Sequence, residues 1–221
     1  MNEFDLYREE VFRRYPQLQK IRELLTQDMP EHEPPKLLDI LIIPKDMHPF
    51  TDPHIPSRDV FLHCYVDDTK LKRLVNHPDK YVNHFQQFGG IVGSDFSVYR
   101  DDPIELRLIS TKINRAIESY YRRHGIYVVT NVRWGTPEDY PFTIDAIGHQ
   151  KIVGISTHGS IKGAENKYYF QHGLGHMLAS VTPEHVLVHG AMPPEVFSEF
   201  AGEAVFHHYD AAITQAHRSY S

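Results

Sequence analysis

The sequence predicts an α/β protein whose parallel sheet of about six strands curves into an incomplete TIM-like barrel, with an N-terminal helical extension. Two observations favour this fold. Short apolar strands alternate with helix-length segments, which is typical of parallel βαβ units. Every second residue of the strands is also polar, whereas a flat sheet covered by helices on both faces would be apolar in both phases. The open doubly wound sheet is the alternative.

The polar phase of the expected strands gathers charge and imidazole on one face of the sheet. It contains His63, Tyr65, Asp67, Gly93, Asp95, Ser97, Asn131, Arg133, Gly154, Ser156, His158 and His189. The other phase contains Leu62, Cys64, Val66, Val92, Phe96, Val98, Val128, Val132, Val153, Ile155, Val186 and Val188. Successive side chains of a strand point to opposite faces, so the second set would pack under helices and the first would line a site.

The first elements are expected within the N-terminal part of the chain. Apolar residues recur at near-helical spacing over residues 3–27, interrupted at Pro16. An apolar run at 37–43 between clustered prolines predicts the first strand. We therefore expect an N-terminal helical extension over 1–30, a proline-rich segment with one strand over 31–57, and an α/β domain over 58–221, all packed as one domain.

The remaining elements follow in regular alternation. We expect strands at 60–66, 90–98, 126–133, 151–157 and 185–190, and helices at 69–87, 103–124, 164–181 and 194–216. Pro78 interrupts the first of these helices, Gly125 ends the second, and Pro193 and Pro194 open the last.

Composition limits the class of protein. A formal charge of −6 disfavours non-specific binding to nucleic acid, which needs a basic surface. No apolar run is long enough to span a bilayer and the N-terminus lacks a signal-peptide pattern, so we expect a cytoplasmic protein without a membrane partner. Cys64 is the single cysteine and lies in the apolar phase, where it is expected to act as a small hydrophobic residue.

Asp95 is the strongest candidate for chemistry. It would end its strand on the polar face, where a carboxylate can serve as a general base, a metal ligand or an ion-pair partner of Arg133. Tyr99 and Arg100 follow in the same loop as candidate ligand-binding residues. Asp67 ends the neighbouring strand in the same phase and is a second candidate carboxylate.

Residues 131–135, Asn-Val-Arg-Trp-Gly, place Asn131 and Arg133 on the polar face and Trp134 at the rim. A planar guanidinium beside an indole suits a ligand with both an anion and an aromatic ring, such as a nucleotide. A structural Asp–Arg ion pair explains the same pattern, and the two interpretations remain open.

A glycine-containing loop at 156–163 precedes a helix and carries Ser156, His158, Gly159 and Lys162. Such loops direct backbone N–H groups at anions. His158 is in phase with Asp95, so we expect it to be an acid or base, and the other three to bind ligand.

A divalent metal is compatible with the sequence but not required by it, and the cofactor is otherwise open. His63, Asp95, His158 and His189 could converge from four strands with ligands that suit zinc, iron or manganese. His172 and His176 are one helical turn apart, but the apolar stripe of their helix predicts that both face away from the core and bind no metal.

Four ordered motifs carry a resemblance to a known family. They are Phe-Leu-His-Cys-Tyr-Val-Asp-Asp at 61–68, Gly-Ser-Asp-Phe-Ser-Val-Tyr-Arg-Asp-Asp-Pro at 93–103, Asn-Val-Arg-Trp-Gly at 131–135 and Ser-Thr-His-Gly-Ser-Ile-Lys at 156–162. Over residues 58–192 the chain resembles domain-of-unknown-function family 4417. The resemblance implies a bacterial or phage setting and no particular activity. His189 stands where an aromatic residue is expected in the family's last strand.

These patterns lead to one function and two alternatives. We expect a hydrolase-type enzyme acting on a phosphorylated or nucleotide-like small molecule, with Asp95, His158 and Asp67 catalytic. The first alternative is a non-catalytic module that binds a nucleotide or anion, or docks a phage or host protein. A DNA-transaction accessory factor is the second, and the acidic charge disfavours it.

Overall fold

The computed structural model describes residues 40–211. Seven parallel strands form one sheet in the order β1-β2-β3-β4-β5-β6-β7. Each strand pairs with the next strand along the chain, and the sheet curves into a nearly closed barrel. β7 and β1 form no ladder, so the barrel has an unsealed seam. The Tyr209 hydroxyl, at the end of β7, donates to the Pro44 carbonyl just before β1. The expected incomplete barrel is confirmed.

Seven short strands and nine helical segments follow one another along the described residues. The strands are β1 (Asp46–Pro49), β2 (Val60–Cys64), β3 (Gly90–Ser94), β4 (Val128–Asn131), β5 (Ile152–Ser156), β6 (His185–His189) and β7 (Val205–Tyr209). The α-helices are α3 (Asp68–Asn76), α4 (Asp79–Phe85), α5 (Ile104–Arg123), α6 (Tyr140–Thr143), α7 (Ala164–Val181) and α8 (Pro194–Phe197). Short 3-10 turns at Pro137–Asp139 and Asp145–Ile147 flank α6, and a third at Ser198–Phe200 follows α8.

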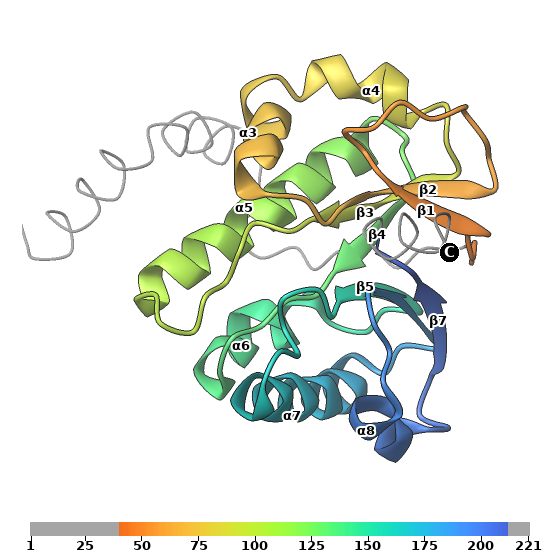
Figure 1. Ribbon diagram of the computed structural model, residues 1–221. Helices are drawn as coiled ribbons and strands as arrows, with labels where there is room; N and C mark the ends of the chain where they lie inside the picture. The colour runs from red at the N-terminus through yellow and green to blue at the C-terminus, as the bar shows by residue number, and fades with distance from the viewer. Residues whose placement is uncertain (1–39, 212–221) are drawn as a thin grey trace, which may run out of the picture.

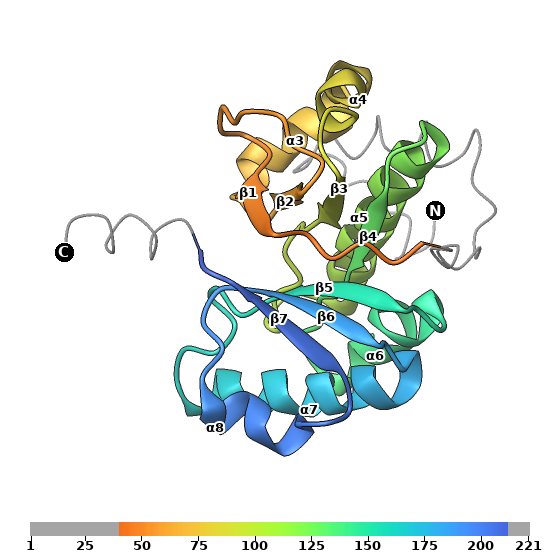
Figure 2. The same ribbon diagram turned by 90° about the vertical axis from the view of Figure 1, so that its right-hand side faces the viewer.

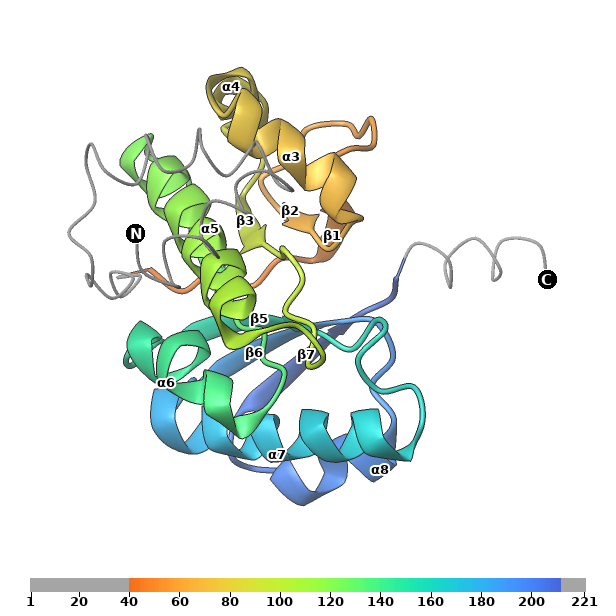
Figure 3. The same ribbon diagram turned by 90° about the vertical axis from the view of Figure 1, so that its left-hand side faces the viewer.

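Two groups of helices cover the outside of the barrel, as Figure 1 shows. One group contains α3, α4 and α5 and packs on β2, β3 and β4 through an apolar cluster centred on Leu62, Ile91 and Val128. The other contains α6, α7 and α8 and packs on β5 and β6 through Val153, Ile155 and Val186. The chain between β3 and α5 passes between the two groups (Figure 3).

The inside of the barrel is apolar at one end and polar at the other. Met47, Phe61, Val92, Val129, Ile152, Leu187 and Tyr209 form a separate buried cluster. One pleat further along the strands, His63, Asn131 and His189 are buried polar residues. The strands therefore change from apolar to polar toward their carboxyl ends, where ligands bind in folds of this kind.

Two predicted elements are wrong. The first strand is β1 at Asp46–Pro49, and residues 40–43 of the predicted strand at 37–43 are not part of the sheet, while 37–39 lie outside the described residues. Over its described residues, the long helix predicted at 194–216 is instead α8, a 3-10 turn and the strand β7, while 212–216 lie outside the described residues. The helical stretch ends at Phe200, Ala201 is extended, and Gly202, with a φ of 98°, lies in the turn that leads to β7. The strand count is seven instead of about six.

The structure also differs from the sequence predictions in where some strands end and in the face of the sheet on which Val92 lies. Three strands end two or more residues earlier than predicted, at Cys64, Ser94 and Asn131. Val92 lies in the barrel interior, whereas the alternation placed it under the helices. The helical extension expected at the N-terminus lies outside the described residues. No helix within residues 40–211 is long and apolar enough to cross a membrane.

Candidate functional site

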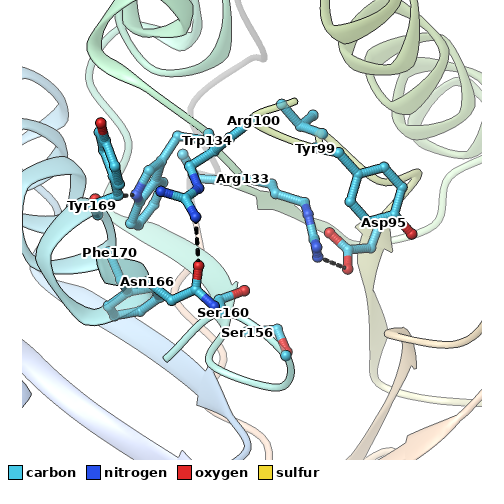
Figure 4. A pocket seen from close by; sticks show the side chains of 14 residues that line it. Asp95, Tyr99, Arg100, Arg133, Trp134, Ser156, Ser160, Asn166, Tyr169 and Phe170 are labelled. Atoms are coloured by element: carbon cyan, nitrogen blue, oxygen red, sulfur yellow. Dashed lines mark hydrogen bonds and ion pairs between the residues drawn. The ribbon is translucent and has the colours of Figure 1, made fainter. Parts of the chain in front are cut away.

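A pocket of ≈ 140 Å³ opens at the carboxyl ends of the strands, between the loops that follow β3, β4 and β5 and the first turns of α7 (Figure 4). Its lining combines two arginines, a buried carboxylate, hydroxyl groups and aromatic rings. The lining residues are Asp95, Val98, Tyr99, Arg100, Val132, Arg133, Trp134, Gly135, Ser156, Gly159, Ser160, Asn166, Tyr169 and Phe170. Seven of the residues predicted to be functional therefore share one pocket: Asp95, Tyr99, Arg100, Arg133, Trp134, Ser156 and Gly159.

Asp95 is a buried carboxylate with a partner on each oxygen. Oδ1 accepts a hydrogen bond of 2.8 Å from Asn131 Nδ2, and Oδ2 accepts one of 2.7 Å from Arg133 Nη1. Burial raises the pKa of Asp95, and the positive charge of Arg133 and the amide of Asn131 oppose that rise. The carboxyl group is thus placed to exchange a proton with a ligand in the pocket.

A β-bulge brings Asp95 into the barrel. His63 pairs with Val92, but the next residue, Cys64, pairs with Ser94, so Gly93 is the additional residue in β3. After the bulge the side chain of Ser94 reaches Asn114 of α5, and Asp95 points inward. The bulge explains why Val92 and Asp95 both face the interior although they are three positions apart.

Asn114 fixes the backbone on both sides of Asp95. Its Oδ1 accepts from the Phe96 N–H at 2.8 Å and from the Ser94 hydroxyl at 2.9 Å, and its Nδ2 donates to the Phe96 carbonyl at 3.1 Å. Asn114 is itself buried on α5. One side chain of a long helix therefore determines where the carboxylate-bearing segment lies.

Glu118 holds the backbone of Asn131 in a similar way. This fully buried carboxylate accepts from the Asn131 N–H at 3.0 Å and pairs with Arg115 on the same helix. Gly93 makes room for it, because a Cβ at that position would lie 2.0 Å from Glu118 Oε1. Neither Asn114 nor Glu118 was predicted as a site residue, since both lie in an amphipathic helix whose pattern gives no sign of a polar role.

Arg100 and the first turns of α7 form the opposite wall of the pocket. The Arg100 guanidinium donates to Asn166 Oδ1 at 2.8 Å, pairs with Glu165 at 3.2 Å and lies 4.5 Å from the centre of the Tyr169 ring. Tyr99 lines the pocket with a side chain that remains largely exposed. Asn166, Ser160 and Tyr169 were not predicted, because their role follows from the packing of α7 and not from strand alternation.

Trp134 forms part of the pocket wall and packs tightly on α7. Its Nε1 donates to the Tyr169 carbonyl at 3.2 Å, and its ring lies 5.4 Å from that of Phe170. The indole occupies the space above Gly173, where a Cβ would lie 2.1 Å from Nε1. The ring is therefore held in place by the protein, with one edge toward the pocket.

A second polar group, made of Ser156, His189, Tyr65 and His63, lies inside the barrel beside Asp95. Ser156 Oγ is 3.1 Å from His189 Nδ1, and the His189 ring stacks on Tyr65 at 4.7 Å and lies 4.5 Å from His63. Burial lowers the pKa of His189 to about 4 and that of His63 well below its usual value. Both imidazoles are therefore neutral at neutral pH.

Two buried polar atoms of this region have no hydrogen-bond partner among the described residues. They are the Tyr65 hydroxyl oxygen and Asn131 Oδ1. A Cβ at Gly154 would lie 3.0 Å from the Tyr65 hydroxyl, so the absence of a side chain there leaves room for it. Unpaired polar atoms are uncommon in protein interiors, and they mark this end of the barrel as a place where further groups can bind.

Four predicted catalytic or ligand-binding residues lie outside the pocket lining, and one of them, Asn131, is buried next to it and bonded to Asp95. Asp67 is exposed and caps α3, where its Oδ1 accepts from the Thr69 N–H at 2.8 Å. Lys162 is exposed in the loop before α7. His158 is exposed too, with its ring 6.4 Å from that of His189. The short β2 and β5 explain the three exposed positions, because alternation does not extend beyond the strand ends.

The four residues that could have formed a metal site do not converge. Among residues 40–211 no three histidine, cysteine, aspartate or glutamate side chains gather as they would around a metal ion. His63 and His189 are neighbours, whereas Asp95 is bonded to Arg133 and Asn131. On α7, the apolar stripe of Phe170, Leu174, Met177 and Val181 is buried as predicted, His172 is exposed, and the half-buried His176 bonds to Asp145 at 2.7 Å.

Comparison with known proteins gives a family and a phage relative. The sequence model described as "Domain of unknown function (DUF4417)" matches residues 26–210. The "Gene 1 protein" of Mycobacterium phage D29 is 27% identical over 131 residues, which are 59% of this chain and 48% of the phage protein. The chain thus aligns with about half the length of that relative. No solved structure matches the chain at a significant level.

Proposed function

The chain belongs to the DUF4417 family, and from that premise we propose that it is a hydrolase-type enzyme acting on a phosphorylated or nucleotide-like small molecule. The observation that carries the proposal is the buried Asp95 carboxylate at the pocket, held between Asn131 and Arg133. A carboxylate with a raised pKa beside a guanidinium combines an acid–base group with an anion-binding group.

In this proposal Asp95 takes a proton from water or donates one to the leaving group, and Arg133 binds the anionic part of the substrate. One nitrogen of the Arg133 guanidinium donates to Asp95, and no other acceptor within residues 40–211 binds this group. The Arg133 side chain is 22% exposed. Its remaining N–H groups can therefore reach a phosphate oxygen. His158 at the rim would act as a second acid. Asp67 and Lys162 have no role in the proposed reaction.

The size of the pocket suggests which part of a substrate it holds. A volume of ≈ 140 Å³ is below the roughly 300 Å³ of common ligand pockets, so a phosphate or a sugar phosphate would fill it. The exposed Tyr99 ring at the rim would then contact the rest of a larger molecule. Trp134, whose ring packs on α7, would contribute an edge and not a stacking face.

The test begins with a thermal-shift screen of nucleotides, sugar phosphates, inorganic phosphate and divalent metal ions, followed by product analysis of each compound that raises the melting temperature. Asp95→Asn should lower the turnover of a hydrolysed compound by about 10²–10⁴-fold while binding persists. Asp101→Asn, an exposed change in the same loop, is the matched control and should retain activity. Equal turnover by the Asp95 variant would contradict the proposal.

A non-catalytic module that binds a nucleotide or an anion is the second candidate. It is favoured by the two hydrogen bonds that already satisfy Asp95, because a carboxylate committed to Arg133 and Asn131 can be purely structural. Ligand stabilisation without any product, unchanged by Asp95→Asn, would decide for this candidate.

The proposal also places the protein in the cytoplasm. Cys64 is its single cysteine and is buried and unpaired, which suits a reducing compartment.

A further inference from the structure

The end of β5 and the end of β6 bring a hydroxyl and an imidazole together at the pocket. Ser156 and His189 are direct partners in the parallel ladder, and their side chains meet inside the barrel with 3.1 Å between Oγ and Nδ1. Ser156 also lines the pocket that contains Asp95 and Arg133 (Figure 4). A serine bonded to a histidine at the wall of a pocket has the arrangement of an activated nucleophile.

The hydrogen bonds around Ser156 leave its hydroxyl hydrogen available to His189. The His158 N–H donates to Ser156 Oγ at 3.2 Å, so one lone pair of the oxygen is already used as an acceptor. The hydroxyl hydrogen is free to point to His189, and Nδ1 accepts it when the ring carries its hydrogen on Nε2. In that tautomer the imidazole nitrogen that faces Oγ carries no hydrogen, as a general base requires.

The His189 ring is also fixed in orientation. Tyr65 stacks on it with an interplanar angle of 15°, and His63 contacts it at 4.5 Å. In the Ser-His-Asp triad a carboxylate orients the base. Here the packing of two rings inside the barrel keeps Nδ1 directed at Ser156.

We propose that Ser156 is a nucleophile and His189 its general base, and that this pair attacks the phosphorus or carbonyl carbon of an ester bound in the pocket. The proposal rests on the proposed hydrolase function and gives its mechanism a covalent intermediate. It assigns Arg133, positioned by its ion pair with Asp95, to the charge of the bound group and Ser156 to bond formation.

A phosphate ester would be cleaved in two steps. The Ser156 hydroxyl proton passes to His189 Nδ1 while Oγ forms a bond to phosphorus and the bond from phosphorus to the leaving oxygen breaks. His189 returns the proton to the leaving oxygen. Water then bonds to phosphorus, the Oγ–phosphorus bond breaks, and the proton of water reaches Oγ through His189.

The test uses a probe that needs no knowledge of the substrate. The full chain is incubated with an alkyl fluorophosphonate, which transfers its phosphonyl group to an activated serine with loss of fluoride, and intact-mass and peptide analysis locate the adduct. We expect one adduct at Ser156. Ser156→Ala should abolish it, and His189→Gln should slow it by about 100-fold, the lower end of the effect of a general base.

Two matched variants control for the type of residue. Ser180→Ala removes a serine of α7 that bonds to Asp145, and His185→Gln changes the histidine at the opposite end of β6. Both should label at the wild-type rate. If His189→Gln does not fold, as judged from its melting curve, Ser156→Ala alone decides.

The proposal is overturned if the wild-type chain acquires no adduct, if Ser156→Ala acquires the same adduct, or if a folded His189→Gln variant labels at an unchanged rate. A substrate that Ser156→Ala hydrolyses as fast as wild type would also overturn it and would leave the Asp95 hydrolase standing with direct attack by water. Labelling at Ser156 in a protein that turns over no compound would instead support the nucleophile and contradict the proposed function.

Discussion

Arg133 donates to Asp95 across 2.7 Å at the inner wall of the pocket, joining β4 to the segment that follows β3. The side chain of Asp95 is 9% exposed and that of Arg133 is 22% exposed, so the pair is only partly accessible to water. Such a pair can be an ion-pair anchor of the fold, or it can present the free edge of the guanidinium to an anion. The two roles predict different effects for a substitution of Arg133 by lysine, which keeps the positive charge and removes the planar guanidinium.

Arg133→Lys is therefore the first prediction. If Arg133 binds a phosphate or carboxylate, we expect the variant to keep its fold and to bind the ligand about 1.5–3 kcal/mol more weakly, because an ammonium group cannot form the same planar contact. Melting temperature and ligand affinity are measured on the same variant. Arg58→Lys, which alters an arginine bonded to the Phe88 carbonyl, is the control. A lowered melting temperature with unchanged affinity would make Arg133 purely structural.

The second prediction concerns the two glycines of α7 that face other elements. A Cβ at Gly173 would lie 2.1 Å from Trp134 Nε1, whereas one at Gly175 would lie 3.2 Å from the Phe200 ring. Gly173→Ala should displace the indole and destabilise the fold by about 1–3 kcal/mol, the cost of overpacking. Gly175→Ala should stay within about 1 kcal/mol, because its contact is offset by better helix propensity.

Fluorescence reports directly on this change, because Trp134 is the single tryptophan of the chain. We expect a shifted emission maximum and weaker ligand binding in Gly173→Ala, and a wild-type spectrum in Gly175→Ala. Identical spectra and stabilities for the two variants would show that the indole does not pack on Gly173 as described.

Asn114 provides the third prediction, since it joins α5 to both neighbours of Asp95. Asn114→Ala leaves the buried N–H and C=O of Phe96 without their partner, so we expect a loss of about 2–4 kcal/mol in the free energy of unfolding. Chemical denaturation measures the loss. Lys112→Ala, on the exposed face of the same helix, should change stability by less than about 0.5 kcal/mol. Equal losses in both variants would contradict the role of Asn114.

The alternation of the central strands was enough to predict most of the barrel and the core of the pocket. β5 and β6 have apolar residues on their helix side and polar residues at their inner carboxyl ends, and this pattern placed Ser156 and His189 correctly inside. The edge strands were harder to predict from the sequence. β1 has the sequence Asp-Met-His-Pro, which carries no β-branched residue, while the more strand-like Ile42 and Ile43 pack against the barrel interior without joining the ladder.

The site departs from simple alternation where the strands stop or bulge. The bulge at Gly93 depends on Glu118 and Asn114, which are distant in sequence, so no local pattern indicates it. Asp67 follows the alternation of β2 in the sequence, but the strand ends at Cys64 and the residue becomes a helix cap. Contacts between elements therefore decide which polar residues reach the pocket.

The last prediction concerns the free energy of unfolding at acid pH. Burial, and then the charge of His158, lower the pKa of His189 to about 4, whereas an unfolded histidine titrates near 6.5. Between these two values the unfolded chain binds more protons than the folded chain, so the contribution of His189 to stability is complete above about pH 6.5 and is lost as the pH falls toward 4. The difference corresponds to about 3 kcal/mol.

Other buried groups act in the same range, so the comparison must isolate His189. His63 has a pKa that is lowered in the same direction, while the raised pKa of Asp95 acts in the opposite sense. We therefore expect the free energy of unfolding of wild type to fall more steeply between about pH 7 and pH 4.5 than that of His189→Gln, whose side chain does not titrate. Urea unfolding at several pH values measures both slopes. Parallel curves for wild type and His189→Gln would show that the imidazole beside Ser156 is not buried in its neutral form.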